Sequence, residues 1–235
     1  MSRVHDPSRT YGWALIVAPT LLYNVLLALL FPFALRSTAA LDERGKTTAV
    51  LGVTLGVELI VLALLIAWLH HTGRTLADLG WGRATTRRAI VLGLLVALLY
   101  SAFTLASPVF GLYAGEISWF KAWGAFVGVI GGAIEELVFR GFVIGELADQ
   151  GVRAEWQVLA SGMLFALIHN GIGLLRGQWY VLPGIGLTFV LGTVLALIYL
   201  DGRRSLTPTV LSHTLINLLI EPWLLLGFVR LMTAR

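Results

Sequence analysis

Long apolar runs separated by short polar segments make up most of this chain. Seven of these runs are long enough, or nearly so, to cross about 30 Å of hydrocarbon as helices. They lie at about residues 12–35, 48–69, 89–107, 122–146, 155–171, 180–200 and 206–220. Pro222 interrupts the pattern, and Trp223 to Met232 predict a short eighth helix. We find no convincing strand, so the pattern predicts an all-α fold: a polytopic membrane helix bundle with seven to eight transmembrane helices.

The composition supports a membrane protein. Of the 235 residues, 57% are hydrophobic and 13% are charged, with a mean hydropathy of +0.84. A soluble domain carries roughly 25% charged residues. We therefore expect a single membrane domain over residues 1–235 and a multi-pass integral membrane protein, located in the cytoplasmic membrane if the source is prokaryotic.

The charges and the absence of cysteine narrow the partners and the chemistry. The net charge is +4, but the arginines lie mostly between apolar runs, where they suit anionic lipid headgroups. We therefore expect the lipid bilayer as a partner and no nucleic acid. Lys and Arg divide almost evenly between the two sides of the spans and favour neither orientation. The chain has no cysteine, which excludes disulfides, Cys-ligated zinc and thiol nucleophiles.

The fourth apolar run contains three charges within six residues: Glu135, Glu136 and Arg140. A charge at membrane depth costs on the order of 2.5–3.5 kcal/mol, so these side chains need partners. Glu136 and Arg140 are spaced i, i+4 and can form an ion pair. Glu135 points roughly 100° away and has no local partner, which makes it a functional candidate or the partner of another span. Gly131 and Gly132 would let another helix approach closely.

Two later runs carry the polar groups that could meet Glu135. A turn near residues 149–152 would place Glu135 and His169 each about 15–17 residues from the same membrane face, roughly 22–26 Å deep. His213 and Asn217 are one helical turn apart and lie about 12–20 Å from that face. Taken singly, such residues are more often packing or hydrogen-bonding groups than catalysts. Their similar depths nevertheless predict that all four converge in one cavity.

This set predicts a hydrolytic site. Glu135 can act as a general base on water, with His169 holding or co-activating that water. His213 and Asn217 can donate hydrogen bonds to the oxyanion that develops at an attacked amide carbonyl. The sequence also permits a second interpretation, in which Glu135, His169 and His213 form a two-His, one-carboxylate zinc site. We favour no metal and no other cofactor, with zinc as the alternative.

Other chemistries find less support. The chain has no His-Glu-x-x-His helix and no Gly-x-Ser-x-Gly elbow. Ser212 adjoins His213 but points about 100° from it on a helix, so the two do not form a dyad. Glu58 is alone in the second run; it could pair with Arg140 or line the cavity, but packing or lipid-side snorkelling is the default. Asn24 in the first run is interpreted as interhelical glue.

Three motifs in these runs resemble the CAAX protease and bacteriocin-processing (CPBP, or Abi) intramembrane proteases. That family carries Glu-Glu-x-x-x-Arg, Phe-x-x-x-His and His-x-x-x-Asn/Asp on successive membrane helices. All three occur here in the same order, with the resemblance covering about residues 120–220. They stand as Glu135-Glu136-x-x-x-Arg140, Phe165-x-x-x-His169 and His213-x-x-x-Asn217.

The resemblance implies about eight membrane helices and a glutamate-type intramembrane endopeptidase. By motif position, Glu135 and His169 would activate water, and His213 and Asn217 would form the oxyanion site. Glu136 and Arg140 would organise the site or bind substrate. Members were once described as metalloproteases, so the resemblance also leaves the zinc-dependent alternative open. Members cleave prenylated CAAX proteins or other peptides, or confer bacteriocin immunity, so a non-enzymatic immunity or scaffold protein is a further alternative.

Overall fold

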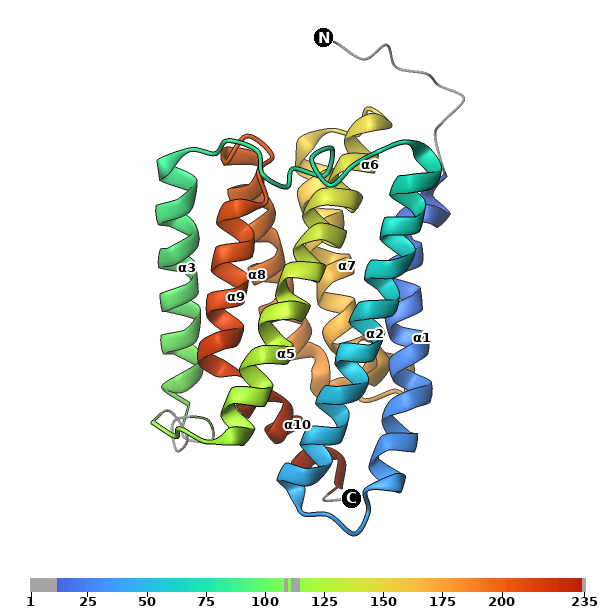
Figure 1. Ribbon diagram of the computed structural model, residues 1–235, viewed down its shortest axis with the longest axis vertical. Coiled ribbons are helices and arrows are strands. Elements are labelled where there is room, and N and C mark those ends of the chain that lie inside the picture. Colours follow the sequence, from blue (N-terminus) through green and yellow to red (C-terminus); the bar gives the residue numbers. More distant parts are fainter. Residues whose placement is uncertain (1–11, 108–109, 111–114, 234–235) are drawn as a thin grey trace.

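The computed structural model describes residues 12–107, 110 and 115–233. Within those residues the chain is helical, without a β-strand, and the long helices run side by side (Figure 1). The elements are α1 (Trp13–Ser37), α2 (Glu43–Thr72), α3 (Arg87–Leu105), α5 (Trp119–Glu136), η2 (Leu137–Val143), α6 (Ile144–Asp149), α7 (Ala154–Leu175), η3 (Trp179–Val181), α8 (Leu182–Asp201), α9 (Thr207–Ile220) and α10 (Trp223–Thr233).

The predicted all-α membrane bundle is confirmed. Helices α1, α2, α3 and α8 are long and apolar enough to cross a membrane by length and composition. The helices correspond to the predicted apolar runs, although α2 extends several residues beyond its run at the N-terminal end. Polar side chains define that start, because Asp42 accepts a hydrogen bond from the Gly45 N–H at 2.8 Å, as an N-cap does. The predicted turn between the fourth and fifth runs is present, since α6 ends at Asp149 and α7 begins at Ala154.

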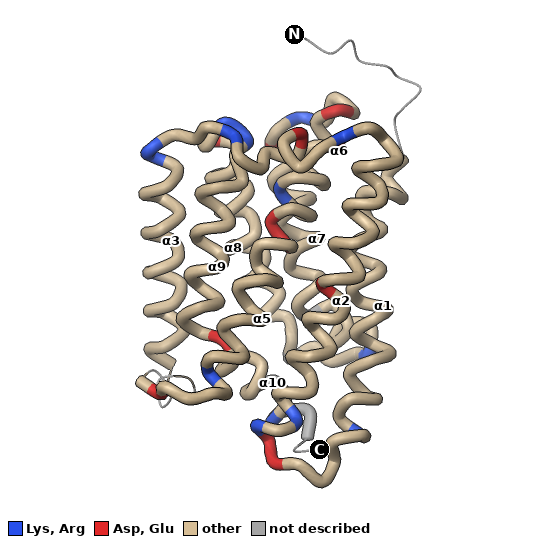
Figure 2. Tube along the Cα trace, in the orientation of Figure 1, with Lys and Arg blue, Asp and Glu red and all other residues tan. Residues whose placement is uncertain are grey.

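Charged residues gather at the two ends of the bundle and are sparse along its middle (Figure 2). Four tryptophans near helix ends are exposed, as an aromatic interfacial belt requires: Trp13, Trp119, Trp156 and Trp179. Trp223 is buried instead, since it packs against Phe120 with ring centroids 5.7 Å apart. The charges at mid-depth are buried inside the bundle, which identifies its interior as the place to search for a site.

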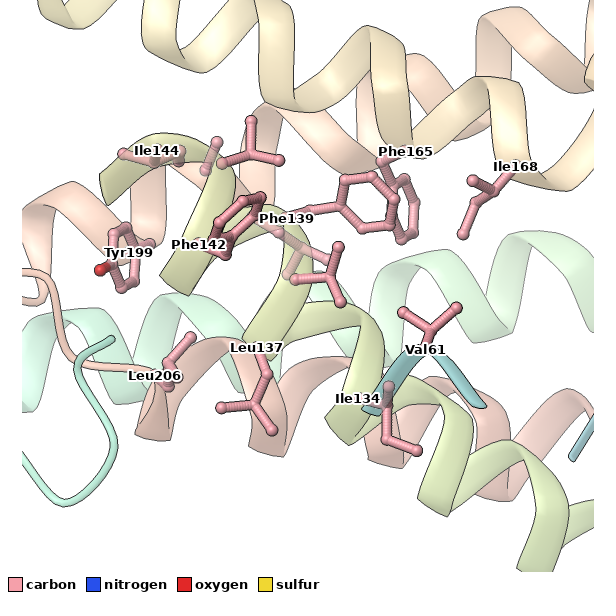
Figure 3. Close-up of a cluster of buried hydrophobic side chains, with 14 of the residues drawn as sticks. Val61, Ile134, Leu137, Phe139, Phe142, Ile144, Phe165, Ile168, Tyr199 and Leu206 are labelled. Carbon is pink, nitrogen blue, oxygen red and sulfur yellow. The ribbon is translucent and has the colours of Figure 1, made fainter. Parts of the chain in front are cut away.

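The central helix of the bundle changes its winding where the predicted motif lies. α5 runs directly into η2, a π-helical segment, and then into α6. All seven residues of η2 are buried, and Phe139 packs edge-on against Phe165 of α7 with ring centroids 5.7 Å apart (Figure 3). π-helical insertions are rare and occur frequently at functional sites. The sequence pattern did not predict this segment.

Glycines on α5 let α9 approach closely. A methyl group added at Gly132 would lie 3.1 Å from Asn217 Nδ2 and 3.3 Å from His213 Cγ. At Gly128 it would lie 2.9 Å from Asn217 Cβ. The close approach expected at Gly132 is therefore confirmed, and it brings the polar residues of α9 against the acidic end of α5.

Candidate active site

The structure brings Glu135 together with both predicted histidines. Glu135 lies at the end of α5 and is 9% exposed. Its Oε2 atom is 3.8 Å from His169 Nε2 on α7 and 3.7 Å from His213 Nε2 on α9. Both distances exceed a direct hydrogen bond, and Oε2 has no hydrogen-bond partner. Three helices thus converge on one carboxylate oxygen, at spacings that a bridging water would fit.

Hydrogen bonds at the opposite ring nitrogens define the tautomer of each histidine. His169 Nδ1 lies 2.9 Å from the Phe165 carbonyl oxygen, and His213 Nδ1 lies 2.9 Å from Glu136 Oε1. A carbonyl and a carboxylate can only accept, so both Nδ1 atoms carry a proton and donate it. In the neutral rings, Nε2 therefore presents a lone pair toward Glu135.

Glu136 and Arg140 form the predicted ion pair, with Arg140 Nη1 at 3.0 Å from Glu136 Oε1 and both side chains fully buried. Arg140 Nη2 also donates to the Gly192 carbonyl oxygen of α8 at 2.9 Å. The sequence predicted the pair but not the second role of Glu136. Its carboxylate neutralises Arg140 and orients His213 with the same oxygen, Oε1.

Phe165 links the three motifs from α7. The Arg140 guanidinium carbon lies 4.5 Å from the centre of its ring, a cation–π distance. The ring centroid is 4.6 Å from that of His169 and 5.5 Å from that of His213. Because Phe165 and His169 are spaced i, i+4, helix geometry alone predicts that they are neighbours. Its contacts with Arg140 and His213 come from tertiary packing.

A cavity of about 390 Å³ lies beside these groups. Glu135, His169 and Asn217 line it, while His213 is buried next to Glu135. Asn217 Nδ2 donates one hydrogen bond to the Gly128 carbonyl oxygen at 2.7 Å, which fixes the amide group on the cavity wall. An amide nitrogen carries two protons, so a second N–H remains for a ligand.

Sequence reasoning underestimated Glu58. The side chain is 2% exposed, so it does not snorkel toward lipid, and it accepts a hydrogen bond from the Tyr23 hydroxyl rather than pairing with Arg140. Both residues line the cavity. The signal in the sequence was an isolated acid at membrane depth, which is itself a functional indicator. The interpretation of Asn24 is confirmed, because Nδ2 donates to the Leu167 carbonyl oxygen of α7 at 3.2 Å.

Glu221 is a further acid on the cavity wall that sequence reasoning missed. It follows α9, in the turn to α10 and outside the spanning helices. Burial raises the pKa of its carboxyl to about 7, although the nearby Lys121 ammonium opposes the shift. Lys121 Nζ itself donates to the carbonyl oxygens of Leu218 and Leu219 at 2.8 and 2.9 Å, at the end of α9.

The three residues of the alternative zinc set lie together. Within the part of the chain that the structure describes, no group of three His, Cys, Asp or Glu side chains is placed to hold a metal ion. The fit of Glu135, His169 and His213 to zinc is therefore poor in this arrangement, and no step of the chemistry below is assigned to a metal.

The chain is similar to known proteins over part of its length. Residues 117–219 match the family model of type II CAAX prenyl endopeptidase Rce1-like proteins. The chain is also similar to the UPF0177 protein YxdF of Lactococcus lactis subsp. lactis (strain IL1403), with 30% identity over 92 residues. Those residues are 39% of this chain and span only 44% of the length of that relative. No solved structure matches the chain significantly.

The matched segment contains all of the predicted site residues, from Glu135 to Asn217. The resemblance to the CAAX protease family is thereby confirmed for this part of the chain. The matched family model is that of type II CAAX prenyl endopeptidases, and it covers less than half of this chain. With the apolar helices, it identifies an integral membrane protein.

Proposed function

We propose that this protein is an intramembrane endopeptidase that hydrolyses a peptide bond with a water molecule activated by Glu135 and His169. The observation that carries the proposal is the set of acceptors around one point. His169 Nε2 and His213 Nε2 lie 3.8 and 3.7 Å from Glu135 Oε2, and Oε2 accepts no hydrogen bond. A carboxylate oxygen and a neighbouring histidine nitrogen that both accept are best satisfied by a molecule that donates two hydrogen bonds. Water has this chemistry.

The attack begins with proton transfer to Glu135. A water held between Glu135 Oε2 and His169 Nε2 donates one O–H to each. As its oxygen bonds to the carbonyl carbon of the substrate, one proton passes to the Glu135 carboxylate. The carbonyl π electrons move to the oxygen, which becomes an oxyanion. When the tetrahedral intermediate collapses, the C–N bond breaks and Glu135 returns the proton to the leaving nitrogen.

In the proposed reaction, Asn217 and His213 stabilise the oxyanion. Asn217 has a free N–H beside the one that it gives to Gly128, and it can donate in any protonation state of the site. His213 can take this role in only one protonation state, because its Nδ1 already donates to Glu136. Its Nε2 carries a proton only when the ring is doubly protonated, and only then can it donate to the oxyanion.

Two observations support the proposed substrate class. The cavity draws apolar walls from helices outside the motifs, including Leu27 of α1, Leu51 of α2 and Leu224 of α10. An apolar cavity inside a membrane bundle suits a hydrophobic or lipidated peptide. The Rce1-like match points to CAAX prenyl substrates, so we propose membrane-associated or prenylated proteins and peptides as the class.

The test is peptide cleavage by the purified protein in lipid vesicles. A quenched fluorogenic peptide with a farnesylated cysteine near its C-terminus is compared with the same peptide without the lipid. We expect cleavage by the wild type and a loss of about 10²–10⁴-fold in Glu135→Gln. Glu155→Gln is the matched control, because Glu155 is an exposed acid at the start of α7.

Full activity of Glu135→Gln would overturn the mechanism. The non-enzymatic alternative predicts instead that Glu135→Ala and His169→Ala leave the cellular phenotype intact at unchanged expression. Cleavage of both peptides at equal rates would retain the protease but reject prenyl recognition.

A further inference from the structure

Another buried carboxyl group, that of Glu58, lies beside Glu135 and outside the segment that matches the family. Glu58 on α2 and Tyr23 on α1 are each 2% exposed. The Tyr23 hydroxyl donates to Glu58 Oε2, and both side chains line the same cavity as Glu135. Residues from α1 and α2 thus complete a wall of the site that α5, α7 and α9 leave open.

Close packing between α2 and α5 brings the two acids together. A methyl group at Gly131 would lie 3.5 Å from Glu58 Oε1, so the carboxyl of Glu58 rests on the surface of α5 at Gly131. Glu135 is one helical turn further along the same face of α5. The side chains of Tyr23, Glu58 and Glu135 line the same cavity, where Glu58 and Tyr23 each interact electrostatically with Glu135.

Two carboxyl groups this close in a buried setting cannot both hold a negative charge without a large penalty. Arg140 is close to Glu135 electrostatically, but its ion pair and its hydrogen bond go to Glu136 and Gly192. The other titratable groups that face Glu135 are His169, His213 and Glu221. A single proton shared between Glu58 and Glu135 removes the repulsion and converts it into a hydrogen bond.

We infer that Glu58, held by Tyr23, is a positioning residue that carries this proton and donates it as a hydrogen bond to Glu135. The inference rests on the proposed hydrolysis. In this arrangement Tyr23 donates to one oxygen of Glu58, and the protonated oxygen of Glu58 donates to Glu135. Glu135 is then kept as a carboxylate, with Oε2 turned toward the two histidines and free to take a proton from water.

Substitutions at position 58 separate this role from packing. Glutamine keeps a neutral donor of nearly the same shape, whereas leucine keeps only volume. We expect Glu58→Gln to retain kcat within about threefold and Glu58→Leu to lose about 10–100-fold in kcat, with KM little changed. Tyr23→Phe should lose less than Glu58→Leu. Equal losses in Glu58→Gln and Glu58→Leu would overturn the inference, and so would an unchanged rate in Glu58→Leu.

A chemical probe tests the same inference without any substrate. Dicyclohexylcarbodiimide enters apolar regions and modifies carboxyl groups in their protonated form, and mass spectrometry locates the adduct. In the wild type at neutral pH, we expect about tenfold more modification at Glu58 than at Glu135. In Glu58→Leu the modification of Glu135 should rise by about tenfold, and in Glu58→Gln it should stay low.

Greater modification of Glu135 than of Glu58 in the wild type would overturn the inference. So would a Glu135 signal that does not change in Glu58→Leu. Because labelling needs no cleavage, these results stand whether or not the peptide assay detects hydrolysis. Failure of the inference is therefore distinguishable from failure of the proposed function.

Discussion

His213 is held by Glu136 and faces Glu135, the residue just before it in the chain. His213 Nδ1 donates to Glu136 Oε1 at 2.9 Å, and Nε2 lies 3.7 Å from Glu135 Oε2. Consecutive side chains on a helix point about 100° apart, and the imidazole ring bridges that difference. One glutamate is thereby buried to orient the ring, while the other is left to act at the cavity.

Removing only one partner of the buried ion pair between Glu136 and Arg140 should strongly reduce the stability of the protein. Removing one partner of a buried ion pair costs about 3–5 kcal/mol, so Glu136→Leu should be strongly destabilised. The double variant Glu136→Leu/Arg140→Met removes both charges and should recover most of that stability. Its cleavage rate should stay low, because His213 has lost its acceptor. Thermal unfolding in detergent and the peptide assay measure the two effects.

The exposed pair of Arg153 and Glu155 provides the control for that experiment. Its side chains are 78% and 65% exposed, so Glu155→Leu should cost no more than about 1 kcal/mol. A double variant as unstable as Glu136→Leu alone would contradict the interpretation, as would a double variant with wild-type cleavage.

Gly132 should be intolerant of even a methyl group. The added carbon would lie 3.1 Å from Asn217 Nδ2 and 3.3 Å from His213 Cγ, tighter than ordinary contact. We expect Gly132→Ala to reduce cleavage by about tenfold or more, since small displacements of catalytic groups are costly. Gly56→Ala is the control, because a methyl group there meets nothing within 4 Å. Equal activity of the two variants would show that the contact between α5 and α9 is not critical.

Stability should depend on pH through Glu221. Its pKa is raised to about 7 by burial, so the folded protein holds this proton more tightly than the unfolded chain. The resulting stabilisation is complete below the ordinary pKa of a glutamate and is lost as the pH rises through about 7. We expect a loss on the order of 1–3 kcal/mol across this window. Thermal unfolding of wild type and Glu221→Gln over a pH series measures it.

The Glu221→Gln variant cannot titrate at this position, so it should lack that part of the pH dependence. The comparison is informative because the other groups near Glu221, including Glu135 and His213, are the same in both proteins. An identical pH dependence in the two proteins would contradict the assignment to Glu221.

Metal removal separates the two versions of the protease. We expect cleavage to persist within about twofold after treatment with 1,10-phenanthroline, because the proposed base is a carboxylate acting directly on water. Elemental analysis should find far less than one zinc ion per protein. A known zinc protease treated in parallel verifies the chelator. Loss of activity that returns with added zinc would favour the zinc-dependent alternative.

Local geometry explains why the sequence was informative about this site. The ion pair of Glu136 with Arg140 and the contact of Phe165 with His169 are both i, i+4 relations, which any helix imposes. Depth along a spanning helix is also countable from a turn, since each residue adds about 1.5 Å. These two measures were enough to predict that Glu135, His169 and His213 would meet.

Relations between helices were beyond the reach of the sequence. The double role of Glu136 and the contact of Phe165 with Arg140 depend on side chains more than 20 residues apart. Glu58 shows the limit most clearly. Alone in its apolar run it resembled a packing residue, and only the approach of α1 and α5 supplied Tyr23 and Glu135 as its neighbours.

The sequence by itself determined the class of the molecule, the helices and the polar residues that enter the bundle, because hydropathy and helical periodicity are local properties. Tertiary structure decided how those residues share hydrogen bonds, and it closed the site with a wall from α1 and α2. The physical reason is that helix rotation and approach depend on how glycines such as Gly128 and Gly132 meet the facing side chains. The spacing of residues within a single helix cannot predict those contacts between helices.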